Sequence, residues 1–257
     1  MRKTAVIQGK GGVAKSTTAD AGTSGIKVVK KGARTLAVDY DPQGNLSFLF
    51  NTKVDECPTM YHVFNGDVTI QEAIQHTPRG DIIVGNGSLV KIESLFPDYE
   101  DGILKLKEQL ALINDDYDYV FIDNQPSISG YLTKQALVAA DDLVVPVTAE
   151  VLTLQGLAKV GAAVERVKKF FNPQLVIDGL LLTRHNPRTT IAKQLEETVR
   201  EWAVQLQTKA YKTFIRESVV VKEAQAKKMS IFEYAPDSNP AQDYFAFIDE
   251  YLKQERK

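Results

Sequence analysis

The sequence predicts an α/β fold in which a mostly parallel, twisted sheet carries helices on both faces. Two observations predict this class. Short apolar runs alternate along the chain with amphipathic stretches of about ten or more residues, the pattern of parallel strands joined by right-handed helical crossovers. The first apolar run also leads directly into a glycine-rich loop and then a helical pattern. Ligands of such folds bind at the carboxyl ends of the strands.

Six apolar runs are expected to be the buried strands of this sheet. They are residues 4–7, 35–39, 81–84, 119–123, 142–147 and 175–183. No internal repeat, low-complexity tract or linker divides the chain, so we expect a single domain over residues 1–257. The region 97–102 is expected to be a loop.

Composition and charge narrow the class of protein. With 44% hydrophobic and 25% charged residues, the chain has ample material for a core. Its single cysteine, Cys57, excludes a disulfide framework and a Cys-x-x-Cys metal or iron–sulfur site within one subunit. The sequence has no signal segment and no apolar run of about eighteen residues, so we expect a cytoplasmic protein without a membrane span. Because the net charge is −2, nucleic-acid binding would depend on a local basic patch.

The glycine-rich loop after the first strand is predicted to cradle phosphate. It comprises Gly9, Lys10, Gly11, Gly12, Val13, Ala14, Lys15, Ser16 and Thr17. Glycine lets successive backbone N–H groups turn toward phosphate oxygens without a Cβ in the way, and the helix that opens at Lys15 adds its positive end. Ala14 stands where the P-loop pattern usually has its last glycine, which requires a negative φ at this residue.

Three side chains of this loop have expected roles at the phosphates. Lys15 is placed to reach the β and γ phosphates, and the Ser16 hydroxyl is placed to ligate a magnesium ion that bridges them. Thr17 is expected to support the site from one residue behind. The loop therefore predicts a nucleotide-binding P-loop fold.

Two carboxylates follow the strand 35–39, which we expect to neighbour the phosphate loop. The segment reads Asp39-Tyr40-Asp41-Pro42-Gln43-Gly44-Asn45. Carboxylates at the end of a strand can position magnesium or a water molecule, and phosphoryl transfer needs mainly such alignment and electrostatic stabilisation. Alone, the segment is more typical of a turn, because Asp, Pro, Gly and Asn all favour turns. Beside a phosphate loop, we interpret Asp39 as a support of the metal or of the loop itself.

A third element is the hydrophobic run 119–123, which ends in Asp123. A buried strand that ends in aspartate is the Walker B pattern, whose carboxylate holds magnesium, often through a water molecule. Asp123 is therefore predicted to be the main magnesium residue.

The loop contains a second lysine, Lys10, which gives the pattern K-G-G-x-x-K-S. This pattern resembles the deviant Walker A motif of the ParA/MinD superfamily of P-loop ATPases. The resemblance implies ATP as the nucleotide and an ATP-dependent homodimer, in which Lys10 reaches the partner's nucleotide. The segment D-x-D-P-Q-G-N looks like switch I of that family, which implies that Asp41 orients the attacking water. In the segment similar to switch II, Gln125 replaces the usual first proline.

The resemblance spans nearly the whole chain. The segment after the last predicted strand looks like the family's base-binding segment, which makes Asn186 and Pro187 candidate adenine contacts. His185 is given no role, because the sequence shows no partnered carboxylate or nucleophile beside it. Residues 214–219, 222–224 and 234–238 also follow a ParA pattern, although Glu217 interrupts its usual Arg-Ser pair.

The resemblance implies a partition function. ParA-type ATPases dimerise on ATP, bind nucleoid DNA without sequence preference and respond to a ParB-type partner on plasmid or chromosome cargo. Non-specific DNA binding requires clustered basic side chains. The candidates are Arg188, Lys193, Arg200, Lys222, Lys227 and Lys228. Because the chain begins with its first strand, it resembles the short class, without an N-terminal DNA-reading extension.

Three other functions compete with partition. A MinD-like positioning ATPase would hold membranes through a basic C-terminal helix, but residues 244–252 are flanked by acids that oppose anionic lipid, which favours a core-packing helix. A metabolic P-loop enzyme would pass ATP energy to a small substrate. A non-hydrolysing scaffold would bind nucleotide as a structural ligand. The departures from the family pattern at Ala14 and Gln125 favour this alternative.

The helix after the phosphate loop has an unusual composition. Gly22 and Gly25 stand in its interior, where each glycine costs about 1 kcal/mol relative to alanine. Either close packing compensates for this cost, or the helix is less stable than its relatives.

Overall fold

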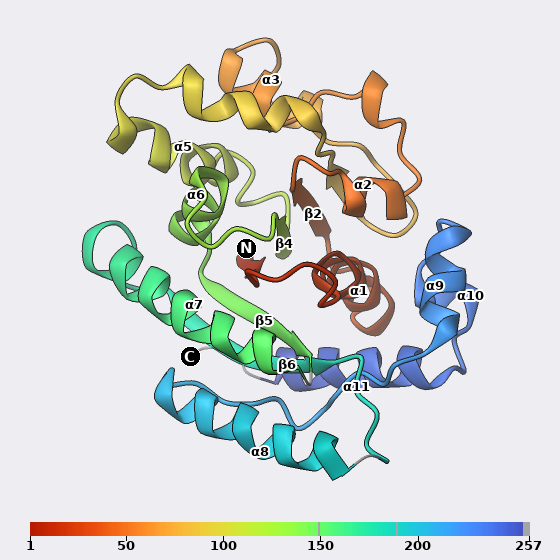
Figure 1. Ribbon diagram of the computed structural model, residues 1–257. Coiled ribbons are helices and arrows are strands. Elements are labelled where there is room, and N and C mark those ends of the chain that lie inside the picture. Colours follow the sequence, from red (N-terminus) through yellow and green to blue (C-terminus); the bar gives the residue numbers. More distant parts are fainter. Residues whose placement is uncertain (149, 189, 254–257) are drawn as a thin grey trace.

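The computed structural model describes residues 1–148, 150–188 and 190–253 and contains one twisted, all-parallel sheet (Figure 1). The strand order is β3-β2-β4-β1-β5-β6. The strands are β1 (Arg2–Val6), β2 (Thr35–Tyr40), β3 (Asp81–Ile83), β4 (Tyr119–Asn124), β5 (Asp142–Thr148) and β6 (Val176–Thr183). All six predicted strands and the α/β class are thus confirmed, with small differences at the ends.

Helices and short 3₁₀ turns connect the strands. They are α1 (Lys15–Val29), α2 (Asn45–Leu49), η1 (Val54–Glu56), α3 (Met60–Asn65), α4 (Ile70–Ala73), η2 (Gly87–Leu95), α5 (Tyr99–Ala111), α6 (Tyr131–Ala139), α7 (Val151–Phe170), α8 (Thr190–Gln205), α9 (Val219–Ala226), α10 (Ile231–Tyr234) and α11 (Asn239–Leu252). No helix in the described part of the chain is both long and apolar enough to cross a membrane.

The expectation of a loop over residues 97–102 is wrong, because α5 begins at Tyr99. Asp98 is the cause. Its carboxylate accepts hydrogen bonds from the backbone N–H groups of Glu100, at 2.8 Å, and Asp101, at 3.4 Å. Such an N-cap satisfies donors that a helix start leaves free, so the helix begins directly after this residue.

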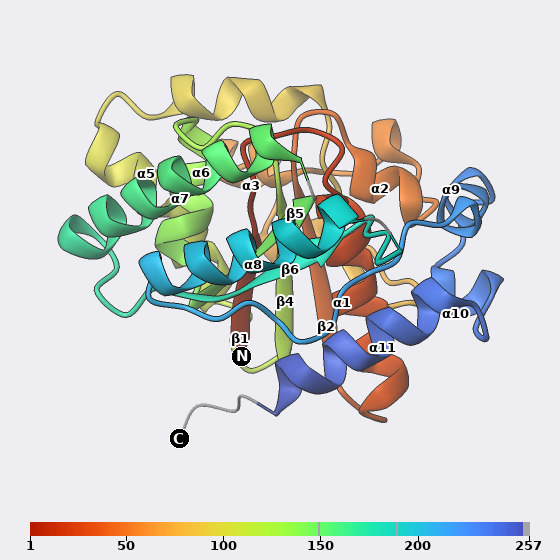
Figure 2. The ribbon, with the colours of Figure 1, turned by 60° about the horizontal axis from the view of Figure 1, so that its bottom comes forward.

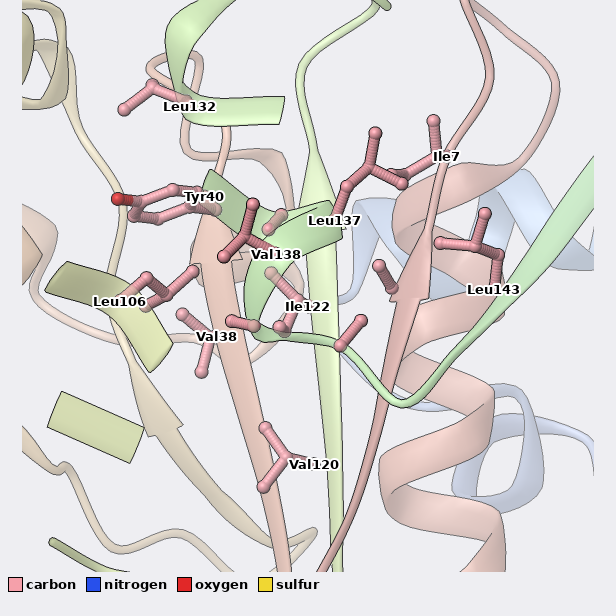
Figure 3. Packing of buried hydrophobic residues seen from close by; sticks show 14 of the residues in the cluster. Ile7, Val38, Tyr40, Leu106, Val120, Ile122, Leu132, Leu137, Val138 and Leu143 are labelled. Atoms are coloured by element: carbon pink, nitrogen blue, oxygen red, sulfur yellow. The ribbon is translucent and has the colours of Figure 1, made fainter. Parts of the chain in front are cut away.

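Alternating strand residues build a core on each face of the sheet. On one face, Val38 and Ile122 pack against Leu106 of α5 and Leu137 of α6 (Figure 3). Helices α7 and α8 extend this layer. Side chains of a strand point alternately to opposite faces of the sheet. Phe121, which precedes Ile122 on β4, therefore belongs to the core on the other face.

The second face is covered by α1 and α11, with α9 and α10 at one end (Figures 1 and 2). Tyr244, Phe247, Ile248 and Tyr251 of α11 are each at most 1% exposed. The prediction that the C-terminal helix packs in the core is therefore confirmed.

Close packing explains the glycines of α1. A Cβ at Gly22 would lie 2.5 Å from the ring of Phe121, and one at Gly25 would lie 2.2 Å from Cδ1 of Ile248. Helix α1 therefore lies so close to the sheet at Gly22, and to α11 at Gly25, that neither position has room for a side chain. The structure thus supports close packing as the compensation for the two glycines of this helix.

Replacing Gly25 with alanine should destabilise the fold by about 1–3 kcal/mol, because overpacking outweighs the gain of about 1 kcal/mol in helix propensity. The new methyl group would meet Ile248 and Phe232, both of which are buried. The matched control is Gly87→Ala, whose Cβ would have no atom within 4 Å. Urea unfolding should leave that control within about 0.5 kcal/mol of the parent chain. Equal stability of the two variants would contradict this packing argument.

Candidate nucleotide-binding site

The carboxyl ends of β1, β2 and β4 meet beneath the phosphate loop. Val6, the last residue of β1, pairs in register with Asp123 of β4, and Asp123 pairs with Asp39 of β2. Strand β4 stands between β1 and β2 in the sheet. This order places the Walker B aspartate at the centre, between the phosphate loop and the two carboxylates that follow β2.

Ala14 has a φ of +64°, so the expected negative φ is wrong. A left-handed conformation costs a non-glycine residue about 1 kcal/mol or more, and the surrounding structure must supply that energy. Gly12, two residues earlier, has a φ of +76°. The Ala14 carbonyl accepts the N–H of Thr18 at 2.9 Å, so the strained residue is also the point where α1 begins.

Lys15 is the buried cation of the site. Its residue is 8% exposed, and its ammonium group donates to the carbonyl of Lys10 at 3.3 Å. Burial lowers the pKa of Lys15, and the nearby carboxylates of Asp123 and Asp41 oppose this effect. A buried ammonium group beside a phosphate cradle has few water molecules to displace before it pairs with an anion.

Asp123 is fully buried, and within the described residues neither of its carboxylate oxygens has a hydrogen-bond partner. Burial raises the pKa of Asp123, as does the charge of Asp39, whereas the neighbouring Ser16 hydroxyl and Lys15 lower it. Unpaired buried oxygens are costly unless a cation or donor satisfies them. The group therefore fits a magnesium ion. In the described part of the chain no cluster of three acidic, histidine or cysteine side chains could cage a metal alone, which suits Mg²⁺, an ion that takes its remaining ligands from phosphates and water.

Asp39 organises the loop that follows β2. One of its oxygens accepts both the backbone N–H and the hydroxyl of Ser47 at 2.7 Å, and the other accepts the N–H of Asp41 at 3.3 Å. Burial raises the pKa of Asp39. The geometry favours the expectation that Asp39 supports the loop, and its role as a metal residue stays a prediction.

Asp41 lies at the wall of the cavity next to the phosphate loop. It is 5% exposed, and its Oδ1 accepts the backbone N–H of Gln43 at 3.0 Å. This bond leaves Oδ2 for a further donor, so Asp41 could accept a hydrogen bond from a water molecule placed in the cavity.

The cavity has a volume of about 650 Å³, within the range of small-molecule sites. Its walls are Gly11, Gly12, Ala14, Lys15, Ser16, Thr17, Asp41, Gln43, Asn45, Phe48, Leu49, Pro126, Arg184, Ile215, Arg216, Glu217, Ser218, Val221, Lys222, Gln225 and Tyr244. Asn186 and Pro187, the predicted adenine contacts, are not among these lining residues. The segment 215–218 and helix α9 line the cavity instead.

Lys10 lies at the rim of the cradle, with its side chain 31% exposed. Its ammonium group pairs with the carboxylate of Glu150, the residue that precedes α7. Gly9 connects this rim to β1, and its N–H donates to the side-chain oxygen of Gln8 at 2.8 Å.

His185 has a carboxylate partner, contrary to the sequence analysis. It is 1% exposed, and its Nε2 lies 2.7 Å from Oε1 of Glu196 on α8. This pair could not be predicted from the sequence, because the carboxylate lies on the next helix rather than beside the histidine. The contact fixes α8 against the end of β6, which is a structural role.

The six candidate DNA-contacting residues form two separate groups. Arg188, Lys193 and Arg200 lie before and along α8, and all three are exposed. Lys222, Lys227 and Lys228 lie on α9 and just after it. The two helices lie apart in both views (Figures 1 and 2), so a single protomer does not bring all six together.

The fold and this site define a P-loop nucleotide-binding protein: a glycine-rich loop, a buried lysine and a Walker B aspartate meet at the carboxyl edge of a parallel sheet. A family model described as an AAA domain matches residues 1–177. The chain is 35% identical over 250 residues to the sporulation initiation inhibitor protein Soj of Bacillus subtilis, with 96% of each chain covered. It belongs to the Soj/ParA family of P-loop ATPases.

Two further proteins are similar to this chain over its whole length. The chromosome partitioning protein ParA of Caulobacter vibrioides is 32% identical over 261 residues, with 100% of this chain and 96% of that protein covered. A solved structure of cobyrinic acid a,c-diamide synthase from Mycobacterium smegmatis, with a bound ATP analogue and magnesium, is similar with a TM-score of 0.82. That structure is 29% identical and covers 100% of this chain and 98% of its own.

Proposed function

We propose that this chain is a partition ATPase. It binds and slowly hydrolyses Mg-ATP, dimerises on ATP, binds DNA without sequence preference, and segregates plasmid or chromosome cargo with a ParB-type partner. The observation that carries the proposal is the buried group of Lys15, Asp123 and Asp41 at the head of a cavity lined by the phosphate loop. The kinship with Soj and ParA proteins over almost the whole chain supports the cellular role.

Each residue of the group has a distinct role in this proposal. The N–H groups of residues 9–17 and the Lys15 ammonium bind the phosphates. Ser16 and Asp123 hold magnesium, with Asp39 in support, and the metal would neutralise charge on the phosphate oxygens. Asp41 orients the attacking water, because it is buried, faces the cavity and keeps one oxygen free of the Gln43 bond.

The dimer and DNA steps rest on more exposed residues. Lys10 would leave Glu150 and contact the nucleotide of the partner subunit. The basic residues of α8 and α9 would then form one nucleoid-binding face from two protomers, with all 257 residues of each acting as a single domain. Because such binding releases counterions from DNA, it weakens steeply with salt.

Replacing Asp41 with alanine should lower the rate of ATP hydrolysis by about a hundredfold or more, the usual loss when a positioned acid–base group is removed. ATP binding and salt-sensitive retention on non-specific duplex DNA should persist, because phosphate and DNA contacts remain. Phosphate release and DNA pull-down, each with and without ATP, measure the two effects.

The matched control for this experiment is Asp55→Ala, which removes an exposed aspartate on η1. It should hydrolyse ATP as the parent chain does. Hydrolysis without any DNA retention in the parent chain would contradict the partition proposal and favour a metabolic role. An Asp41→Ala variant that still hydrolyses ATP would refute the role of Asp41.

A further inference from the structure

Two consecutive residues at the end of β6 hold two consecutive carbonyls of the phosphate loop. The Thr183 hydroxyl lies within donor distance of the carbonyl of Val13, at 3.1 Å, and of the carbonyl of Val147 on β5, at 3.3 Å. The Arg184 guanidinium donates through Nη1 to the carbonyl of Gly12 at 3.0 Å. The two contacts with the phosphate loop join segments that are some 170 residues apart in the chain.

The direction of these bonds matters for phosphate binding. In a trans peptide the C=O and N–H groups point in opposite directions. A bond that draws the Gly12 carbonyl toward β6 therefore turns the N–H of Val13 away from β6. The bond on the Val13 carbonyl does the same for the N–H of Ala14. Such cradles bind anions through their backbone N–H groups, so bonds to these two carbonyls restrict the orientation of the N–H groups of Val13 and Ala14.

Arg184 is itself held in place. Its Nη2 lies 3.0 Å from a carboxylate oxygen of Glu217. The backbone of Glu217 is fixed in turn, because its N–H donates to the carbonyl of His185 at 3.0 Å. The guanidinium thus spans from a fixed carboxylate to the phosphate loop, a fork geometry that lysine cannot reproduce.

We propose that Arg184, anchored by Glu217 and acting with Thr183, is a positioning residue of the phosphate cradle. The inference rests on the proposed nucleotide binding. It also explains how Ala14 is kept at a positive φ without glycine, since the carbonyls of the two preceding residues are fixed from β6.

The test is calorimetric titration of the full chain with Mg-ADP and, separately, with a non-hydrolysable Mg-ATP analogue. Arg184→Ala should raise the dissociation constant for both nucleotides by the same factor, about threefold to tenfold, the size of effect of one ordinary hydrogen bond, because this contact acts on the nucleotide through the loop. Thr183→Val should act in the same direction. Arg184→Lys should recover part of the loss and Glu217→Gln most of it, because a donor to the loop or an acceptor for Arg184 remains. The melting temperature without nucleotide should fall by no more than about 2–4 °C in Arg184→Ala, since this side chain is 43% exposed.

Arg34 supplies a matched control. It makes the same two kinds of contact, a carboxylate oxygen of Asp118 at 3.3 Å and the carbonyl of Asp115 at 2.7 Å, far from the cavity. Arg34→Ala should leave both affinities unchanged. An Arg184→Ala variant with parental affinities would overturn the inference. So would a loss confined to the ATP analogue, which would mean direct contact with the γ phosphate. If the parent chain binds neither nucleotide, the proposed function itself fails.

Discussion

Lys15→Ala should lower the affinity for Mg-ATP by about a hundredfold or more. The Lys15 ammonium is buried at the base of the cradle, where little water can replace it as a partner for phosphate. Truncating one partner of a buried charge pair costs about 2–5 kcal/mol, and each 1.4 kcal/mol is about a tenfold change in affinity. ADP should lose less affinity than ATP, because the lysine is predicted to reach the β and γ phosphates. Calorimetric titration measures both.

The control for this variant is Lys27→Ala, at the far end of the same helix. Lys27 is exposed in the last turn of α1, so its removal changes the charge of the chain equally without touching the cradle. It should bind Mg-ATP as the parent chain does. If Lys15→Ala binds as tightly as Lys27→Ala, the nucleotide does not lie against the phosphate loop.

The strands could be predicted because each is a contiguous buried run whose composition reveals it. Their order could not. β4 follows β3 in the chain but lies between β1 and β2, and this pairing depends on how the whole sheet assembles. The start of α5 was not predicted, for a local reason. Asp98 is of a residue type common in loops, but here its carboxylate caps the helix.

In the site, too, local motifs could be predicted from the sequence, whereas contacts between distant segments could not. Residues 9–17, Asp41 and Asp123 could be proposed from the sequence because each belongs to a short motif with its own chemistry. Arg184 could not, because it acts on Gly12 from 172 residues away, and nothing near it in the sequence indicates that contact. The negative φ predicted for Ala14 is wrong for a related reason. Local energetics favour a negative φ for alanine, whereas the contacts from β6 hold the loop in a shape that overrides this preference.

A buried ionic network stabilises the opposite end of the sheet from the nucleotide site. Arg2 donates to the carboxylate of Asp142 at 2.7 Å and to that of Asp178 at 2.9 Å. Its guanidinium also lies 3.8 Å from the ring centroid of Tyr251, near the end of α11. Figure 2 shows the start of β1 beside this end of the helix. One cation thus serves two carboxylates whose side chains are at most 5% exposed.

Arg2→Ala should therefore destabilise the fold by about 3–5 kcal/mol, the usual cost of leaving buried charges without their partner. The loss should depend on pH. Burial raises the pKa of Asp142, and Arg2 opposes that rise, so removing the guanidinium raises this pKa further above its unfolded value. A carboxyl group with a raised pKa in the folded state favours folding less as pH increases. Urea unfolding should show a larger loss at about pH 8 than at about pH 5.

Nucleotide affinity separates this effect from the cradle. Because the network lies at the other end of the strands, Arg2→Ala should bind Mg-ATP with parental affinity at temperatures where it is folded. A second variant, Asp142→Asn, removes one of the two buried charges and retains a polar partner for Arg2, so it should cost less than Arg2→Ala, and its cost should not grow with pH. A loss of stability for Arg2→Ala that is the same at both pH values would refute the electrostatic account and leave lost packing on Tyr251 as the cause.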